Sequence, residues 1–212
     1  MVTIIDYGVG NLFSLVSSFS YIGEDAAVSS DPGEILRADR LILPGVGAFG
    51  DAAEKLRATG IGDAVRRAAA DGVPLLGICL GMQLLFDSST EYGVHEGLGL
   101  LRGQVRPIGG VIPAGLKIPH IGWNALRFTE RGRECPLFSD VGEGEHVYFV
   151  HSYYAADCGD SVAATAEYGV PLTAAVSDGR SVFGTQFHPE KSGDVGLRIL
   201  RSFSGIKKGG SD

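Results

Sequence analysis

One short stretch decides the fold of this chain: residues 75–83, which read Leu-Leu-Gly-Ile-Cys-Leu-Gly-Met-Gln. An apolar run meets a segment of helical composition at Cys79, in the form of a nucleophile elbow with Cys in the place of Ser. Such a sharp turn strains the nucleophile, and flanking glycines avoid collisions with neighbouring backbone. A helix N-terminus there favours the thiolate. Cys79 is therefore a candidate nucleophile; the alternative is a buried cysteine that acts as a small hydrophobe.

Apolar runs alternate with helix-compatible stretches on both sides of this turn in the first half of the chain. The pattern predicts strands at Val2–Asp6, Ala26–Ser29, Arg40–Leu43 and Leu75–Ile78, helices at Asn11–Tyr21, Gly50–Thr59 and Ile61–Asp71, and the start of another helix at Leu80–Phe86. This alternation is typical of an α/β fold, a parallel sheet with helices on both faces. Ligands of such sheets collect at the carboxyl ends of the strands.

The rhythm changes near Leu98 to shorter runs separated by Gly and Pro. Further strands, antiparallel or mixed, are expected on the same core, at Glu145–Ala155, Val162–Tyr168, Leu172–Ser177 and Ser181–Gln186. Ser192–Phe203 reads as a closing helix. We expect a single domain over residues 1–206, with a mixed, mostly parallel central sheet, and a disordered polar tail over residues 207–212.

The composition bounds the function. With 44% hydrophobic and 20% charged residues, the 212-residue chain can build one sizeable core. Its 18 basic and 25 acidic residues give a net charge of −7 without a basic run, which argues against nucleic-acid binding. Neither a signal peptide nor a membrane span is indicated, so the cytoplasm is the expected compartment. The 3 cysteines have no CxxC spacing and the 5 histidines no ligand-like spacing, so we expect no disulfide scaffold and no metal.

A second candidate motif, Gln-Phe-His-Pro-Glu, occupies residues 186–190 at the end of a predicted strand. In extended backbone His188 and Glu190 would share a face, which provides a general base and the group that orients it. The imidazole could take the proton of Cys79 and deliver it to leaving ammonia, while Glu190 would fix its tautomer. The alternative is an ordinary surface pair at a strand end.

A third candidate, Pro-Gly-Val-Gly at residues 44–47, follows another predicted strand. Its glycines expose backbone N–H groups, and Gly45, Val46 and Gly47 with the N–H of Leu80 could form an oxyanion hole. The alternatives are a plain Gly-rich turn or a phosphate cradle, but the Lys-Ser/Thr of a P-loop is missing. Parallel topology would bring all three motifs to one edge of the sheet, where they supply the parts of an acyl-transfer site.

Residues 77–83 together with His-Pro-Glu at 188–190 resemble the class I, or triad-type, glutamine amidotransferases. The resemblance implies a flavodoxin-like fold, no cofactor, and a reaction in which Cys79 attacks the side-chain amide of L-glutamine to release ammonia. It places Cys79, His188 and Glu190 as the triad and Gly45–Gly47 as the oxyanion strand. Gln83, Ser152 and Tyr153 fall on the family's glutamine-binding segments; otherwise Gln83 reads as an exposed helix residue and Tyr153 as a core aromatic.

Further segments resemble one branch of the family, the glutaminase subunits of imidazole glycerol phosphate synthase: Asp6–Asn11, Pro44–Gly47, Pro119–Asn124 and Tyr148–Tyr153. That resemblance implies a heterodimer with a separate cyclase subunit, a (β/α)₈ barrel, in histidine biosynthesis. The implied interface residues are Asn11, Trp123, Tyr148 and Lys191, although a lone Trp is usually a core residue. Two rivals are a glutaminase for a different synthase, which the segments around Asn11 and Trp123 disfavour, and a non-catalytic regulatory partner, which would not need the triad. No role is assigned to Cys135, Cys158 or His95.

Overall fold

The computed structural model describes residues 1–209, and an eight-stranded sheet forms their centre. In sheet order its strands are β2 (Ala26–Ser29), β1 (Val2–Ile5), β3 (Arg40–Leu43), β4 (Leu75–Ile78), β14 (Val182–Thr185), β13 (Pro171–Ser177), β12 (Val162–Glu167) and β9 (Arg127–Phe128). The five strands from β2 to β14 pair in parallel, and the remaining strands pair antiparallel. The predicted mixed, mostly parallel α/β sheet is confirmed.

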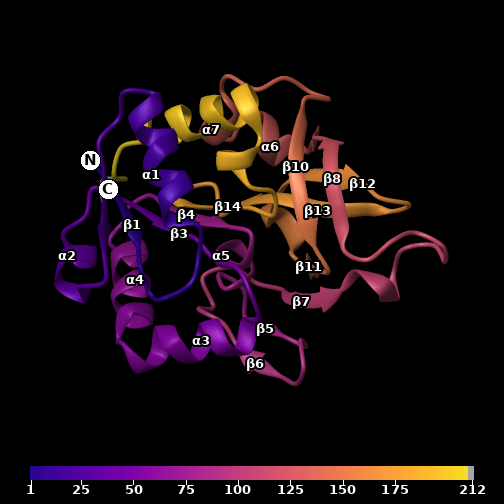
Figure 1. The fold of residues 1–212 in the computed structure, drawn as a ribbon, viewed down its shortest axis with the longest axis horizontal. Coiled ribbons are helices and arrows are strands. Elements are labelled where there is room, and N and C mark those ends of the chain that lie inside the picture. The colour runs from indigo at the N-terminus through magenta and orange to yellow at the C-terminus, as the bar shows by residue number, and fades with distance from the viewer. Residues whose placement is uncertain (210–212) are drawn as a thin grey trace.

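Helices cover both faces of the parallel half (Figure 1). On one face lie α1 (Leu12–Tyr21) and α7 (Gly193–Gly205), and on the other α3 (Phe49–Ala58), α4 (Ile61–Ala70) and α5 (Leu80–Gln83); α2 (Pro32–Leu36) and α6 (Glu130–Arg133) are short additions. Neighbouring strand residues serve opposite cores: Ile4 packs with α1 and α7, whereas Ile5 packs with α3 and α4. Burial on both faces explains why these strands are continuous apolar runs.

Strands between residues 88 and 156 also form two small sheets outside the central one (Figure 1). One pairs β8 (His120–Ala125) with β10 (His146–His151), and the other contains β11 (Tyr153–Ala156), β7 (Gln104–Pro107), β5 (Ser88–Ser89) and β6 (His95–Glu96). Single 3₁₀ turns lie at Ile108–Gly110 (η1), Pro136–Phe138 (η2), Gly159–Ser161 (η3) and Pro189–Lys191 (η4).

Two predicted elements were wrong in extent. The strand expected over Glu145–Ala155 is two strands in different sheets. Residues up to His151 pair with β8, whereas residues from Tyr153 onward pair with β7. The helix expected from Leu80 to Phe86 ends at Gln83, because the carbonyls of Leu84 and Phe86 accept hydrogen bonds from Leu98 and Gly99 instead of continuing the helix.

The C-terminal segment after α7 is anchored in part. The Nε of Arg40 donates to the carbonyl of Ile206 at 2.7 Å, and the N–H of Gly209 donates to the carbonyl of Gly72 at 3.1 Å. Residues 210–212 of the expected tail lie outside the described residues, so the boundary after residue 206 stays a prediction. Among residues 1–209, no helix combines the length and apolar character that a membrane crossing requires.

Candidate active site

Three neighbouring parallel strands end at the same edge of the sheet. The strands β3, β4 and β14 are adjacent, and the chain continues from them into Pro44, Cys79 and Gln186 respectively. The N–H of Cys79 donates to the carbonyl of Thr185 at 2.7 Å, so the ends of β4 and β14 are tied together. The predicted convergence of the three motifs is confirmed.

Cys79 occupies the sharp turn between β4 and α5. Its φ of 54° and ψ of −110° lie in a region that L-residues rarely adopt, so its backbone is strained. A Cβ on Gly77 would lie 2.7 Å from the carbonyl oxygen of Gly81, and a Cβ on Gly81 would collide with the carbonyl of Leu43. The glycines are therefore required by close backbone contacts, as the elbow predicts. The helix that follows is a single turn, so it contributes free N–H groups rather than a long helix dipole beside the sulfur.

His188 and Glu190 form a buried pair beside this turn. His188 Nδ1 lies 2.8 Å from Glu190 Oε1, and both side chains are almost fully buried. Burial lowers the pKa of His188, but interactions with Cys79 and Glu190 outweigh it and raise that pKa to about 9. Pro189 and Glu190 belong to the turn η4 rather than to an extended strand, so this turn places the two side chains together.

The second oxygen of Glu190 is buried without a hydrogen-bond partner among the described residues. Its carboxylate therefore has His188 as its main polar contact, which favours a protonated imidazole. The described residues show no aligned hydrogen bond between His188 and Cys79, although their proximity is sufficient to affect the His188 pKa. Catalytic hydrogen bonds often tighten only when substrate binds.

The Gly45–Gly47 segment lies against the elbow. A Cβ on Gly45 would lie 2.9 Å from the backbone nitrogen of Gly81, and Gly47 has a φ of 94°, which favours glycine. Within residues 1–209, the N–H groups of Val46, Gly47 and Leu80 donate no hydrogen bond. They are thus free to bind an anionic oxygen.

Tyr7 holds the start of this segment through a hydrogen bond. It was not predicted as a site residue. Its hydroxyl donates to the carbonyl of Pro44 at 2.7 Å. Burial raises the pKa of this phenol, and the interaction with Cys79 raises it further. The hydroxyl therefore stays protonated and can act as a hydrogen-bond donor. Its position directly after a buried strand was the available signal.

The expected glutamine-binding residues meet beside the nucleophile. The Nε2 of Gln83 donates to the carbonyl of Tyr153 at 3.2 Å and to Oε1 of Gln186 at 3.0 Å. Gln83 is buried rather than an exposed helix residue, and Tyr153 is half-buried. Ser152 lies in the break between β10 and β11. Gln186 was not predicted, although its Nε2 lies 3.8 Å from the Cys79 sulfur.

The expected interface residues lie at the surface near this edge. Trp123 of β8 is 55% exposed and packs edge-to-face against Tyr148 of β10, with ring centroids 6.1 Å apart. Tyr148 accepts a backbone hydrogen bond from His188, and Lys191 is exposed on η4. Asn11 caps α1 by accepting from the N–H of Ser14 at 3.4 Å. Trp123 is therefore not a core residue.

The three residues without an assigned role are Cys135, Cys158 and His95, and their burial and packing can be described. Cys135 and Cys158 are buried and unpaired, and burial raises the pKa of both thiols, that of Cys158 to about 11. His95 packs over Gly50, where a Cβ would lie 2.7 Å from the ring. No group of three His, Cys, Asp or Glu side chains in residues 1–209 is arranged to hold a metal ion.

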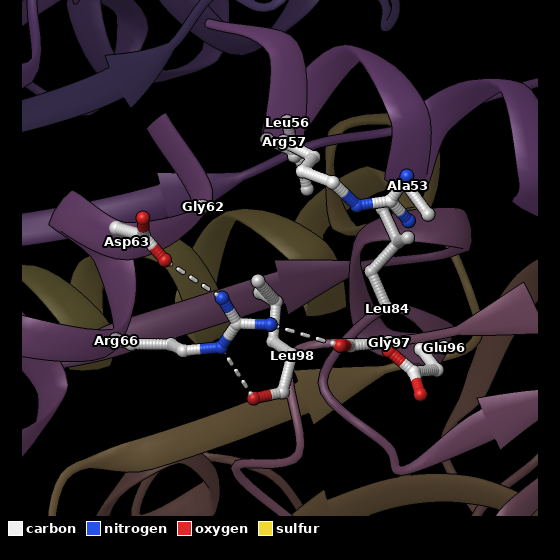
Figure 2. Close-up of a pocket in the computed structure, with 10 residues that line it drawn as sticks. All are labelled: Ala53, Leu56, Arg57, Gly62, Asp63, Arg66, Leu84, Glu96, Gly97 and Leu98. Atoms are coloured by element: carbon white, nitrogen blue, oxygen red, sulfur yellow. Dashed lines mark hydrogen bonds and ion pairs between the residues drawn. The ribbon is translucent and has the colours of Figure 1, made fainter. Parts of the chain in front are cut away.

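A separate cavity of about 190 Å³ lies between α3, α4 and the segment after β6 (Figure 2). Arg66 crosses it and donates to the carbonyls of Leu98 and Gly97 and to Asp63. No thiol, imidazole or hydroxyl lines this cavity: the lining residues are Ala53, Leu56, Arg57, Gly62, Asp63, Arg66, Leu84, Glu96, Gly97 and Leu98. It lacks the groups for acyl transfer, whereas the Cys79 edge has them.

Comparison with known proteins agrees with this geometry. The model of the family "Glutamine amidotransferase class-I" matches residues 3–204. The chain is 54% identical to "Imidazole glycerol phosphate synthase subunit HisH" of Geobacillus thermodenitrificans, over 99% of this chain and 97% of that protein. It is 48% identical to the protein of the same name from Sulfurimonas denitrificans, over 96% of this chain and 97% of that one.

Solved structures agree at the level of the fold. "Structure of PurLQS from Thermotoga maritima" superposes with a TM-score of 0.74 at 21% identity, covering 96% of this chain and 97% of that one. "Crystal structure of glutamine amidotransferase" superposes with a TM-score of 0.73 at 21% identity, covering 97% of this chain and 100% of that one. With the family model matched over nearly the whole chain, the protein belongs to the class-I glutamine amidotransferases.

Proposed function

We propose that this chain is the glutaminase subunit of an imidazole glycerol phosphate synthase, which hydrolyses L-glutamine to glutamate and ammonia for a separate subunit. The observation that carries the proposal is the meeting of Cys79 with the buried His188–Glu190 pair at one sheet edge. The relatives of about 50% identity bear the name of this synthase subunit. We assign the activity to a domain of residues 1–206 and expect it in the cytoplasm.

The triad chemistry follows from the charges at the site. His188, with a pKa of about 9, takes the thiol proton and leaves a thiolate beside an imidazolium. The sulfur attacks the side-chain carboxamide carbon of glutamine, His188 protonates the departing nitrogen, and ammonia leaves a glutamyl thioester. A water molecule then attacks the thioester and gives its proton to His188, which returns it to the sulfur as glutamate departs. Glu190 stabilises each imidazolium.

The backbone around the elbow is suited to the tetrahedral intermediates. The unused N–H groups of Leu80, Val46 and Gly47 are the proposed oxyanion donors, with Gly45 providing the close approach to α5. The Tyr7 hydroxyl holds the Pro44 carbonyl at the start of this segment.

Substrate recognition is proposed at Gln83, Ser152 and Tyr153, which lie on α5 and at the β10–β11 break; Gln83 connects to the sulfur through Gln186. The buried amide of Gln83 and the carbonyl of Tyr153 are polar groups held in place by hydrogen bonds, which suits an amino-acid substrate with amide and charged ends.

The proposed partner is a cyclase subunit of (β/α)₈ form, bound as a heterodimer over Asn11, Trp123, Tyr148 and Lys191. An exposed Trp packed on a Tyr is the kind of aromatic anchor that dominates interfaces. Because the Tyr148 carbonyl accepts from the N–H of His188, the same strand contacts both the partner face and the triad.

The test is glutamate release by the chain alone, with a cyclase subunit, and with that subunit and its nucleotide substrate. We expect slow hydrolysis alone and strong stimulation in the full mixture. Activity without stimulation would favour a glutaminase for another synthase, and no activity in any mixture would favour a non-catalytic partner.

A further inference from the structure

A line of polar groups in successive contact connects β8 to the nucleophile. It begins at half-buried Asn124 and continues through buried side chains and one carbonyl, in the order Asn124, His120, His151, the Tyr153 carbonyl, Gln83, Gln186 and Cys79. The residues His120 and His151 have no part in the triad chemistry. Each donor and acceptor along the line can be assigned from the groups at its ends.

The first assignment comes from Asn124. Its Nδ2 donates to the carbonyl of Glu167 at 2.8 Å, and a carbonyl can only accept, so the amide orientation is fixed. The same Nδ2 lies 3.3 Å from Nε2 of His120. His120 Nε2 must therefore be the acceptor, and the ring carries its proton on Nδ1.

The second assignment comes from Tyr153. Its carbonyl lies 2.8 Å from Nδ1 of His151, which must donate. Between the rings, Nδ1 of His120 lies 3.0 Å from Nε2 of His151, so His120 donates and His151 accepts. The two independent ends give the same tautomers, and the line is consistent only when both rings are neutral.

The surroundings of the two rings agree with this state. His120 stacks against Phe149 and Tyr168, with ring centroids 4.8 and 4.2 Å apart. Burial lowers the pKa of both imidazoles, that of His151 to about 4, and the charges of His120 and His188 lower the latter further. No carboxylate faces either ring among these contacts.

The Tyr153 carbonyl also orients the amides on the other side. It accepts from Gln83 Nε2, which places the same nitrogen 3.0 Å from Gln186 Oε1. The amide of Gln186 must then present its Nε2 toward the Cys79 sulfur, at 3.8 Å. This contact holds Gln186 as a hydrogen-bond donor to the nucleophilic sulfur.

We propose that His120 and His151 are positioning residues for glutamine hydrolysis, which as neutral Nδ1–H tautomers fix the Tyr153 carbonyl and thereby the amides that face Cys79. The inference rests on the proposed function and deepens it. His120 and Asn124 belong to β8, whose exposed side chains include Ile121 and Trp123. The line therefore begins directly behind the proposed partner face.

The variants His151→Phe and His151→Asn test this role in the complex with the cyclase subunit. Phe removes both hydrogen bonds of the ring, and we expect kcat/KM for glutamine to fall about 10- to 100-fold. Asn retains a donor at the position of Nδ1, so it should recover part of the loss. The matched control is His146→Phe, an exposed histidine on the same strand, which should leave the activity unchanged.

Wild-type activity in a folded His151→Phe variant, or an Asn variant as impaired as Phe, would overturn the role. Nitrogen-15 NMR of the unmodified protein at neutral pH gives a readout independent of any variant. We expect both rings neutral with the proton on Nδ1, and an imidazolium or an Nε2–H tautomer in either ring would contradict the assignment. Glutamine hydrolysis that survives Cys79→Ala would instead overturn the proposed function.

Discussion

His188 and His151 are both buried and both connect to the Cys79 site, yet their pKa values move in opposite directions. The pKa of His188 rises to about 9, whereas that of His151 falls to about 4. Burial disfavours the charged form of both. The difference lies in the partners: His188 faces a carboxylate and a thiol, and His151 faces a carbonyl and a neutral imidazole. Burial alone therefore does not decide what a histidine does.

The comparison separates two tasks within one site. A histidine beside an anion can take and return a proton, which the triad chemistry requires. A histidine between a carbonyl and another neutral ring keeps one tautomer and so holds its neighbours in place. If the two histidines have these different tasks, the same substitution at each position should have different consequences.

The largest contrast is expected from one substitution made at both positions. His188→Asn removes the proton-transfer group, so kcat/KM for glutamine should fall about 10²- to 10⁴-fold. His151→Asn preserves a donor to Tyr153, so its loss should be at least about tenfold smaller. Glutamate release by both variants in the complex measures the difference. Equal losses at the two positions would remove the distinction.

A smaller effect is expected from Glu190→Gln, which keeps the shape of the orienting group but not its charge. We expect the pKa of His188 to fall and activity to decrease on the order of 10²-fold, less than for loss of His188 itself. Titration of the ring by NMR measures the first effect. The His151 resonance serves as the internal control, and an unchanged His188 midpoint would show that Glu190 does not set its charge.

The smallest effects are expected in the stability of the folded protein, where the contributions of His188 and His151 should depend on pH in opposite directions. His188 binds its proton more tightly in the folded protein. Its contribution to the free energy of unfolding should therefore be complete below pH 6.5 and lost as the pH rises to about 9. His151 binds its proton more weakly in the folded protein. Its contribution to the free energy of unfolding should therefore be lost as the pH falls from 6.5 to about 4. Urea unfolding of wild type, His188→Asn and His151→Phe at a series of pH values measures both effects. His188→Asn should lack the loss of stability at high pH, and His151→Phe should lack the loss at low pH. Identical pH profiles for the three proteins would refute the assignment.

The sequence predicted that the proposed triad residues meet at one sheet edge, because the signals for this arrangement are local. The Gly-flanked elbow at Cys79 follows a continuous apolar strand, and parallel pairing then brings His188 and Gly45 to the same edge. The pair His188–Glu190 was predicted as neighbours two residues apart, although a 3₁₀ turn rather than a strand joins them.

The line from β8 could not be predicted in the same way. His120 and His151 meet only because β8 pairs with β10, and β8 carries Gly122 at a φ of 131° and polar Asn124 instead of a regular apolar alternation. Gln186 was quoted as part of a motif, but its role depends on the amide orientation that the Tyr153 carbonyl imposes from a distant segment. Such contacts leave no periodic signal in the sequence.

The most direct test of the account is the synthase reaction of the complex with Cys79→Ala, driven either by glutamine or by added ammonium salt. We predict that glutamine-driven synthesis is abolished while ammonium-driven synthesis remains at the wild-type level, because only the release of ammonia requires the thiol. Glutamine-driven turnover that survives the substitution would contradict the assignment of Cys79 as the nucleophile.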